Sequence, residues 1–391
     1  MEAVTTAQRT GAPSGTAAKV TVTTASMSFS EVPIPMSRTL THDDGLAAVY
    51  GGGILGGGGG GHLADGLARV ESIFNGEYAD PELVSVEELA PDDVVACVAM
   101  VGAPSAESAF ISDEQYISTV HLLKQAIGGE LAAVMTNENG PATTINGWLQ
   151  AAALGLPVLD APANGRAHPT GVMGALQLHQ EPDYVSYQAF AGGRGREKLA
   201  GVLNGPLDGV AGAIRALSVR GGGMIGVCRN QVPVSRAAAY GAVGGISFAI
   251  DLGTAFLRGS TGAERIANAV EFLGGDIIAH GTVKEIDLRR DGGFDVGRVA
   301  IGGPRRLELS FWNEYMSAEM DGERLATFPD LIMTMDSESG DPILSAKIRP
   351  GQRVTVIVAS KSRLVLGASM FDREQLAGIE PILGLPILEH Q

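Results

Sequence analysis

The chain has 391 residues, of which 45% are hydrophobic and 18% charged, and this composition is that of a globular protein long enough for two domains. The net charge of −16 argues against a general nucleic-acid-binding role, which needs clustered basic residues. Because no apolar run approaches the roughly 20 residues that span a membrane, and the N-terminus lacks the apolar core of a signal peptide, we expect a cytoplasmic protein. The two cysteines, Cys97 and Cys228, show no metal or disulfide spacing.

Residues 1–36 are predicted to form a flexible tail, and residues 37–185 an α/β domain. In the second segment, three short apolar runs, DVVACVAMV, ELAAVM and LPVLDA, are typical of buried strands. Two helical patterns separate them: DEQYISTVHLLKQAIGG, with acids at its start and glycines at its end, and ATTINGWLQAAALG. This βαβαβ order predicts a mainly parallel sheet with right-handed crossovers.

Polar side chains follow each of these three strands, in GAPSAES (102–108), TNENGPATT (136–144) and DAPANGRAHP (160–169). Ligands of parallel sheets bind beyond the carboxyl ends of the strands. We therefore expect a small-molecule site at this edge of the sheet, with Ser105 and Asn139 among the residues that contact the ligand.

Residues 186–391 are predicted to form a second domain that begins with helices and continues as a β-rich sandwich or barrel. VSRAAAYGAVGGISFAIDLGTAFL has the small residues of one or two buried helices. From residue 276 onward, short β-like runs alternate with DG, GG, SG and PG turns.

The glycine-rich stretch GGGILGGGGGG (51–61) precedes an amphipathic helical pattern, and three interpretations of it compete. A Rossmann loop needs a strand before it, and a Walker loop needs Gly-Lys-Ser/Thr at its end. The preceding HDDGLAAVYGGGIL looks helical and the run ends Gly61-His62-Leu63, so no nucleotide is expected. A plain linker would not need nine glycines, and the interpretation we favour is a ligand-contacting loop in which Gly59, Gly60 and Gly61 present backbone amides.

Five blocks in order carry a resemblance to a known family: the glycine stretch, VGAPSAES, NENGPATTINGWLQAAALGLPVLDAPANGRAHP, FWNEYMSAEMDGERLATFPDLIMTMDSESGDPI and GQRVTVIVAS. The chain resembles the DUF917 or S-methyl-thiohydantoin desulfurase proteins from about residue 39 onward. The resemblance implies an α/β domain, a β-rich domain, and hydrolysis at a thiohydantoin- or hydantoin-type ring. The chain departs from the family pattern at His62, Pro162, His168 and Thr170, and it reads Asn-Glu-Asn-Gly where the family tends to read Glu-Ile-Gly-Gly.

Such a hydrolase needs an activated water, an acid for the leaving group and donors for the developing anion. Glu138 and Asp160 are candidate bases, and each has the alternative of capping a helix or turn. Arg166 is a candidate clamp for a substrate carboxylate, or else half of a structural ion pair. Asn313 and Glu314 are expected to reach the same cleft from the second domain, unless they are a solvated strand pair.

His62 and His168 are candidate ligands of a divalent metal, with zinc the first choice, or a helix cap and a loop histidine. No HxH or HExxH spacing is present, so a metal site would be assembled from distant segments. The first functional hypothesis is a homo-oligomeric hydrolase that removes sulfur from, or opens, a small cyclic substrate. The second is a non-catalytic, ligand-binding subunit that works beside a hydantoinase or oxoprolinase.

Overall fold

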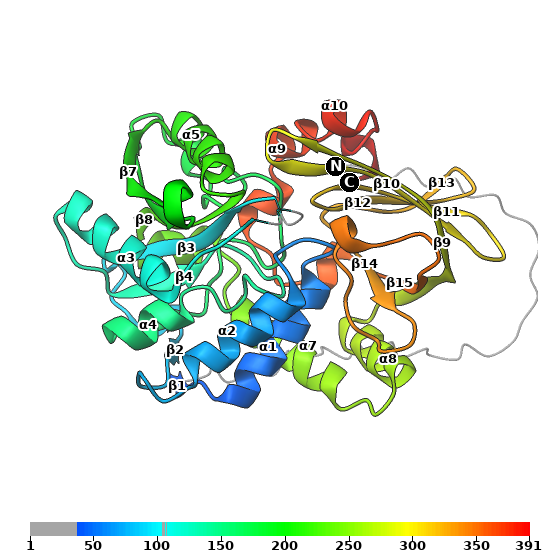
Figure 1. Ribbon diagram of the computed structural model, residues 1–391, viewed down its shortest axis with the longest axis horizontal. Coiled ribbons are helices and arrows are strands. Elements are labelled where there is room, and N and C mark those ends of the chain that lie inside the picture. The colour runs from blue at the N-terminus through cyan, green and yellow to red at the C-terminus, as the bar shows by residue number, and fades with distance from the viewer. Residues whose placement is uncertain (1–36, 104–105, 107) are drawn as a thin grey trace, which may run out of the picture. The chain divides into compact units, whose positions relative to one another are not determined.

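The computed structural model describes residues 37–391 except 104, 105 and 107, and the predicted tail of residues 1–36 lies outside this range. Within the described residues, two sheets carry the fold (Figure 1). The first sheet has eight strands in the order β1-β2-β5-β4-β3-β8-β6-β7: β1 Arg38–Thr39, β2 Glu82–Val84, β3 Val94–Gly102, β4 Ala133–Thr136, β5 Val158–Leu159, β6 Ser186–Gly192, β7 Leu199–Gly205 and β8 Met224–Pro233.

The second sheet has seven strands, all paired antiparallel, in the order β13-β12-β11-β10-β9-β15-β14. Its strands are β9 Asp276–Asp291, β10 Phe294–Gly302, β11 Leu307–Trp312, β12 Glu314–Met320, β13 Glu323–Thr327, β14 Leu331–Asp336 and β15 Arg353–Ala359. The sheet is curled into a half-barrel, as Figure 1 shows in yellow and orange. The predicted class, an α/β part followed by a β-rich part, is confirmed.

The helices are α1 His42–Leu55, α2 Leu63–Ile73, α3 Asp113–Ile127, α4 Trp148–Leu154, α5 Leu207–Arg220, α6 Val234–Tyr240, α7 Gly245–Leu257, α8 Gly262–Leu273, α9 Arg373–Ala377 and α10 Glu380–Leu383. Short 3-10 helices are η1 Val86–Glu88, η2 Leu178–Gln180, η3 Gly195–Glu197, η4 Ser345–Lys347, η5 Lys361–Arg363, η6 Ala368–Phe371 and η7 Leu388–His390. In the described part of the chain no single helix is long and apolar enough to cross a membrane, although the bent pair α6 and α7 passes that test by length and composition.

The predicted βαβαβ unit is β3-α3-β4-α4-β5, with parallel pairing of β3 to β4 and of β4 to β5. Helix α3 begins at a capping box on Ser112 and ends at Gly128, which adopts φ +64° as C-terminal glycines commonly do. Successive residues of β3 enter different hydrophobic clusters, with Ala96 and Val98 in one and Val95 and Cys97 in the other. Both faces of the sheet are therefore buried, which explains why the strand is a continuous apolar run.

The first sheet continues past residue 185, because β6, β7 and β8 join it as antiparallel strands. Strand β8 pairs with β3 along its length, so a segment from the second half of the chain lies next to the central strand of the first half. Figure 1 shows this as a green strand beside the cyan ones. The pairing places a charged side chain of β8, Arg229, opposite Cys97 in the middle of β3.

Helix α1 is the segment HDDGLAAVYGGGIL that the sequence predicts to be helical, and it packs against α7 through glycine. Gly51 to Gly53 lie in the last turns of α1. A Cβ on Gly51 would overlap the Ala249 carbonyl oxygen, and one on Gly253 would overlap the Ala47 carbonyl oxygen. These glycines let the two backbones approach, so only residues 56–61 form the loop.

Gly51→Ala and Gly253→Ala are expected to lower the free energy of unfolding by several kcal/mol, because the overlapping atoms are backbone and the helices must separate. The matched control is Gly212→Ala in α5, where an added Cβ meets nothing within 4 Å. That change is expected to stabilise the protein by up to about 1 kcal/mol. Urea unfolding of the three variants measures both effects, and equal midpoints for all three would contradict the helix-contact explanation.

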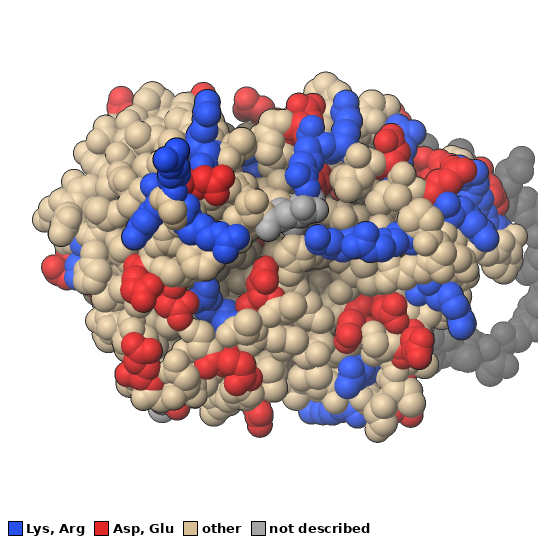
Figure 2. All heavy atoms as spheres, in the orientation of Figure 1, with Lys and Arg blue, Asp and Glu red and all other residues tan. Residues whose placement is uncertain are grey.

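The surface described by the structure carries charges of both signs. In Figure 2, acidic and basic side chains interleave over the face shown, and neither sign covers it. The net charge of −16 is thus spread over the sequence without forming a single acidic face in this view.

Candidate active site

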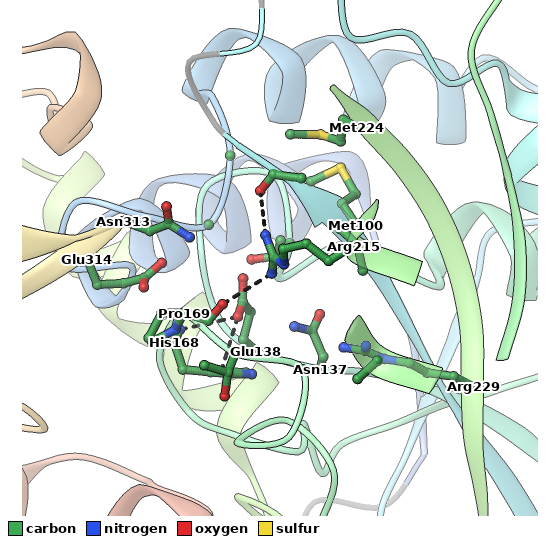
Figure 3. Close-up of a pocket in the computed structure, with 18 residues that line it drawn as sticks. Met100, Asn137, Glu138, His168, Pro169, Arg215, Met224, Arg229, Asn313 and Glu314 are labelled. Carbon is green, nitrogen blue, oxygen red and sulfur yellow. Dashed lines mark hydrogen bonds and ion pairs between the residues drawn. The ribbon is translucent and has the colours of Figure 1, made fainter. Parts of the chain in front are cut away.

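A small cavity of about 60 Å³ lies where the carboxyl end of the first sheet meets the β11–β12 hairpin of the second. Its charged and titratable lining residues are Glu138, His168, Arg215, Arg229 and Glu314. In Figure 3 the labelled side chains include Arg229 from β8 of the first sheet and Glu314 from β12 of the second, with Glu138, His168 and Arg215 between them. Residues from both halves of the chain line this cavity.

Glu138 follows β4 and is held in a tight turn. The Thr136 hydroxyl donates to the Glu138 carbonyl oxygen at 3.2 Å and to the Thr143 carbonyl oxygen at 2.6 Å. The Glu138 side chain accepts a hydrogen bond from the His168 backbone N–H at 3.3 Å and lies 3.1 Å from His168 Nδ1. Burial raises the pKa of Glu138 from its ordinary 4.5 to about 7, against the opposing effects of the His168 amide and the Arg229 charge.

His168 serves as a neutral partner of Glu138. Burial lowers the pKa of its imidazole to about 3. The Asn164 Nδ2 atom donates to the Met173 carbonyl oxygen at 2.7 Å and also lies 3.2 Å from His168 Nδ1. Nδ1 has one bonding position in the ring plane: as an acceptor it binds the Asn164 amide or the protonated Glu138 carboxyl, and when it carries the ring proton it donates to the ionised Glu138 carboxylate. The imidazole thereby fixes the orientation of Glu138.

Glu314 enters the cavity from the turn between β11 and β12. Asn313 adopts φ +58° there, its Oδ1 accepts from the Asp295 N–H at 2.9 Å, and its N–H donates to the Asp295 carbonyl at 2.7 Å. This double contact sets the direction of the next side chain. Burial first, and the nearby Glu138 charge second, raise the pKa of Glu314 well above its ordinary value, although Arg166 acts in the opposite direction.

The glycine loop lies against Glu314 and the turn after β4. Gly57, Gly58, Gly60 and Gly61 all have positive φ, between 55° and 93°, and this conformation favours glycine. The Gly57 carbonyl accepts from the Tyr315 N–H at 2.7 Å, and the Gly60 carbonyl accepts from the Ala142 N–H at 3.0 Å. Gly60 and Gly61 line the cavity. Gly59 does not line the cavity but contacts the Glu314 side chain, since a Cβ at Gly59 would overlap the Glu314 Oε1 atom.

Arg215 and Arg229 supply the positive charge of the cavity, and the sequence analysis missed both. Arg215 on α5 donates to the carbonyls of Gly102 at 3.3 Å, Gly293 at 3.1 Å and Pro169 at 3.2 Å, and its guanidinium stacks 4.1 Å from the Phe294 ring. Arg229 on β8 is buried, and its Nε has no hydrogen-bond partner among the described residues. An arginine inside the apolar run MIGVCRNQVP was the available signal, because charged residues in buried strands are rare.

Two family models match the chain, the S-Me-THD-like N-terminal domain over residues 46–200 and the S-Me-THD-like C-terminal domain over residues 208–367. The chain belongs to the S-Me-THD-like family. No curated protein matches it. The fold of this S-Me-THD-like protein is shared by a crystal structure of a protein from Chromobacterium violaceum, which is 22% identical, with a TM-score of 0.66 over 89% of this chain and 96% of that one.

Five of the predicted site residues of this S-Me-THD-like protein that the structure describes do not line the cavity: Gly59, His62, Asn139, Asp160 and Arg166. Asp160 Oδ1 accepts from the Ile246 N–H at 2.8 Å, and its Oδ2 accepts from the Ser247 hydroxyl at 2.5 Å. The first turn of α7 thus occupies its carboxylate, as the capping alternative expected. Asn139 Nδ2 donates to the carbonyls of Gly165 and Gly245, and it too is a structural contact.

Arg166 is fully buried and does not line the cavity. Its Nη1 donates to the carbonyls of Pro329 and Asp330, and its guanidinium lies 4.8 Å from the Phe328 ring. Its charge lowers the pKa of Glu314 and also that of His168. Ser105 lies outside the described residues.

The predicted metal ligands are not brought together. His168 lines the cavity, whereas His62 does not and begins α2 without a side-chain capping bond. Among the residues that the structure describes, no group of three His, Cys, Asp or Glu side chains could hold a metal ion. The described side chains therefore do not form the zinc site that the sequence suggested.

The buried Glu138 is expected to cost stability as pH rises. In the unfolded chain a glutamate loses its proton near 4.5, but in the folded protein Glu138 does so near 7. Between these values the folded state binds the extra proton, so the free energy of unfolding falls with rising pH. The difference corresponds to about 3 kcal/mol, at about 1.4 kcal/mol per pKa unit.

The Glu138→Gln variant lacks this titration. The difference in melting temperature between the variant and the parent is therefore expected to shift in favour of the variant as the pH rises from 5 to 8. The surface substitution Glu87→Gln is the control. A Glu138→Gln difference that stays constant across the range would show that the carboxyl titrates normally.

Proposed function

We propose that this protein is a hydrolase that acts on a small five-membered ring of the thiohydantoin or hydantoin type. The observation that carries the proposal is the pair Glu138 and Glu314, two buried carboxyl groups that face one cavity beside Arg215 and Arg229. Membership of the S-Me-THD-like family supports the ring class. Catalytic acids and bases are typically pairs whose surroundings separate their pKa values.

The two glutamates would divide the proton transfers. Near neutral pH, Glu138 with a pKa of about 7 is substantially ionised. Burial and the Glu138 charge raise the pKa of Glu314 well above its ordinary value, so an ionised Glu138 favours the protonated form of Glu314. Glu138 removes a proton from water as the water oxygen bonds to the ring carbon. Glu314 then gives its proton to the departing group, sulfur if the C–S bond breaks or nitrogen if the ring C–N bond breaks. Water supplies both the new C–O bond and the replacement proton, so the step needs no oxidant or reductant.

The arginines would stabilise the negative charge that develops on the sulfur or oxygen of the ring. Arg215 is fixed by three carbonyls and an aromatic ring, and is therefore preorganised. Arg229 has an unpaired Nε in a buried position, which is a donor available to such an anion. Charge stabilisation by fixed donors in a water-poor site is commonly the largest contribution to catalysis.

The test incubates the purified full-length protein with 2-thiohydantoin, its S-methyl derivative and hydantoin. Release of sulfide or methanethiol reports C–S cleavage, and the ring-opened acid reports C–N cleavage. We expect one of these products at a rate that disappears in the Glu138→Gln, Glu314→Gln double variant. Saturable binding of these rings without any product would overturn the hydrolase and favour the second hypothesis, a ligand-binding subunit.

A further inference from the structure

We infer that a second cavity beside the active site holds the substituent carried by the substrate ring, and that it selects uncharged apolar substituents. The inference rests on the proposed function, because it names the part of the ring substrate that lies outside the reacting centre. The second cavity measures about 350 Å³, against about 60 Å³ for the active cavity. Met100 and Met224 line both, so these two side chains form the boundary between them.

The boundary is made of movable side chains. Met224 pairs with Gly102, and Gly226 with Met100, so the methionines are diagonal neighbours on β3 and β8. Figure 3 shows both side chains at one end of the active cavity. Methionine is unbranched and adapts its shape to its neighbours at low cost. A ring held between Glu138 and Glu314 could therefore extend a substituent past Met100 and Met224.

The wall of the second cavity is mainly apolar and contains an unused donor. Phe110, Ile111, Ile145 and Leu149 line it. Asn146 also lines it, is 6% exposed, and its Nδ2 has no hydrogen-bond partner among the described residues. A buried amide without a partner loses free energy unless a ligand supplies the acceptor. An apolar substituent with a hydrogen-bond acceptor matches this wall.

The charges in the wall disfavour an anionic substituent. Asp65 and Asp113 face a single cation, Arg69. The Arg69 guanidinium is already used, since its Nη1 donates to Asp113 Oδ1 and it lies 4.4 Å from the Tyr116 ring. The Ser72 hydroxyl donates to the other Asp113 oxygen. A carboxylate arm would therefore meet net negative charge, and the described lining residues offer it no unpaired cation. We expect this charge balance to disfavour substrates with a carboxylate arm.

The experiment compares 2-thiohydantoins that bear an isobutyl arm or a 2-carboxyethyl arm at the same ring carbon. For the unmodified protein, we expect kcat/KM for the isobutyl ring to exceed that for the carboxyethyl ring by about tenfold or more, a difference of about 1.4 kcal/mol. Asp65→Lys adds a cation to the same wall, and should lower this ratio about tenfold or invert it. The charge-matched control is Asp183→Lys, an exposed residue outside the cavity lining, which should leave the ratio unchanged.

Phe110→Ala gives a second readout that does not depend on charge. Phe110 is 41% exposed, so its removal should leave the melting temperature nearly unchanged. It should lower kcat/KM for the isobutyl ring more than for the carboxyethyl ring. A ratio near or below one in the unmodified protein, or a ratio unaffected by Asp65→Lys, would overturn the inference. If no ring yields product, calorimetric Kd values for the same two rings decide it by the same ratio, and only the hydrolase proposal is lost.

Discussion

Glu138→Gln is expected to leave the fold intact and to lower turnover by about two orders of magnitude or more, the usual loss when a general base is removed. Glutamine keeps the size of the side chain and can still accept the hydrogen bond from the His168 amide, but it cannot take a proton from water. In the unmodified enzyme, kcat/KM should rise as pH increases through about 7, where Glu138 loses its proton. Initial rates between pH 5 and pH 9, with circular dichroism as the control for folding, measure both effects.

Glu314→Gln is the partner experiment, and it separates the acid from the base. Because Glu314 acts while protonated and its pKa is raised well above the ordinary value, the unmodified enzyme should lose activity again as Glu314 gives up its proton. The variant should be slower by a comparable factor and should lose that alkaline decline while it keeps the rise near 7. A Glu138→Gln enzyme with near-normal rates, or one that retains the rise near pH 7, would remove Glu138 from the mechanism.

Gly59→Ala is expected to reduce turnover by about tenfold to a hundredfold with little change in melting temperature. Gly59 does not have a positive φ, so alanine fits its backbone conformation. The added methyl group would overlap Glu314 Oε1 and lie 2.6 Å from Cδ and 2.8 Å from Cγ, so the whole Glu314 side chain must shift. Displacement of a catalytic group by about 1 Å can cost about a hundredfold in rate. Melting temperature and turnover measured on the same sample test this directly.

Gly60→Ala, one residue further on, is the contrasting control. Gly60 has φ +77°, and its added Cβ would lie 2.5 Å from the Gly140 Cα, so both the conformation and the backbone contact are unfavourable. This variant should lose stability, on the order of 1–3 kcal/mol for the backbone conformation alone. If Gly59→Ala instead loses activity only in proportion to its unfolded fraction, its contact with Glu314 has no catalytic importance.

Much of the local structure was predictable from the sequence, because it depends on neighbours along the chain. The cap at Ser112, the glycine at position 128 and the valine-rich run of β3 each act within a few residues, and together they specify the βαβαβ unit. The same reasoning located Glu138, since it follows a buried strand in a parallel sheet. Asn313 and Glu314 were found through the family resemblance, and the structure places them beside the glycine loop.

The tertiary structure alone decided which charged groups share the cavity. Asp160 and Glu138 both follow buried strands, yet the N-terminus of α7 takes up the Asp160 carboxylate while the Glu138 carboxylate faces the cavity. Arg229 lies in the cavity because β8 pairs with β3, and Arg215 because it donates from α5 to the Gly102 carbonyl at the end of β3. Both contacts join segments more than a hundred residues apart. Local sequence signals act over a few residues, whereas burial, and the pKa values that follow from it, depend on every segment packed around a side chain. The sequence by itself therefore determined the elements of this protein, and long-range packing determined its site.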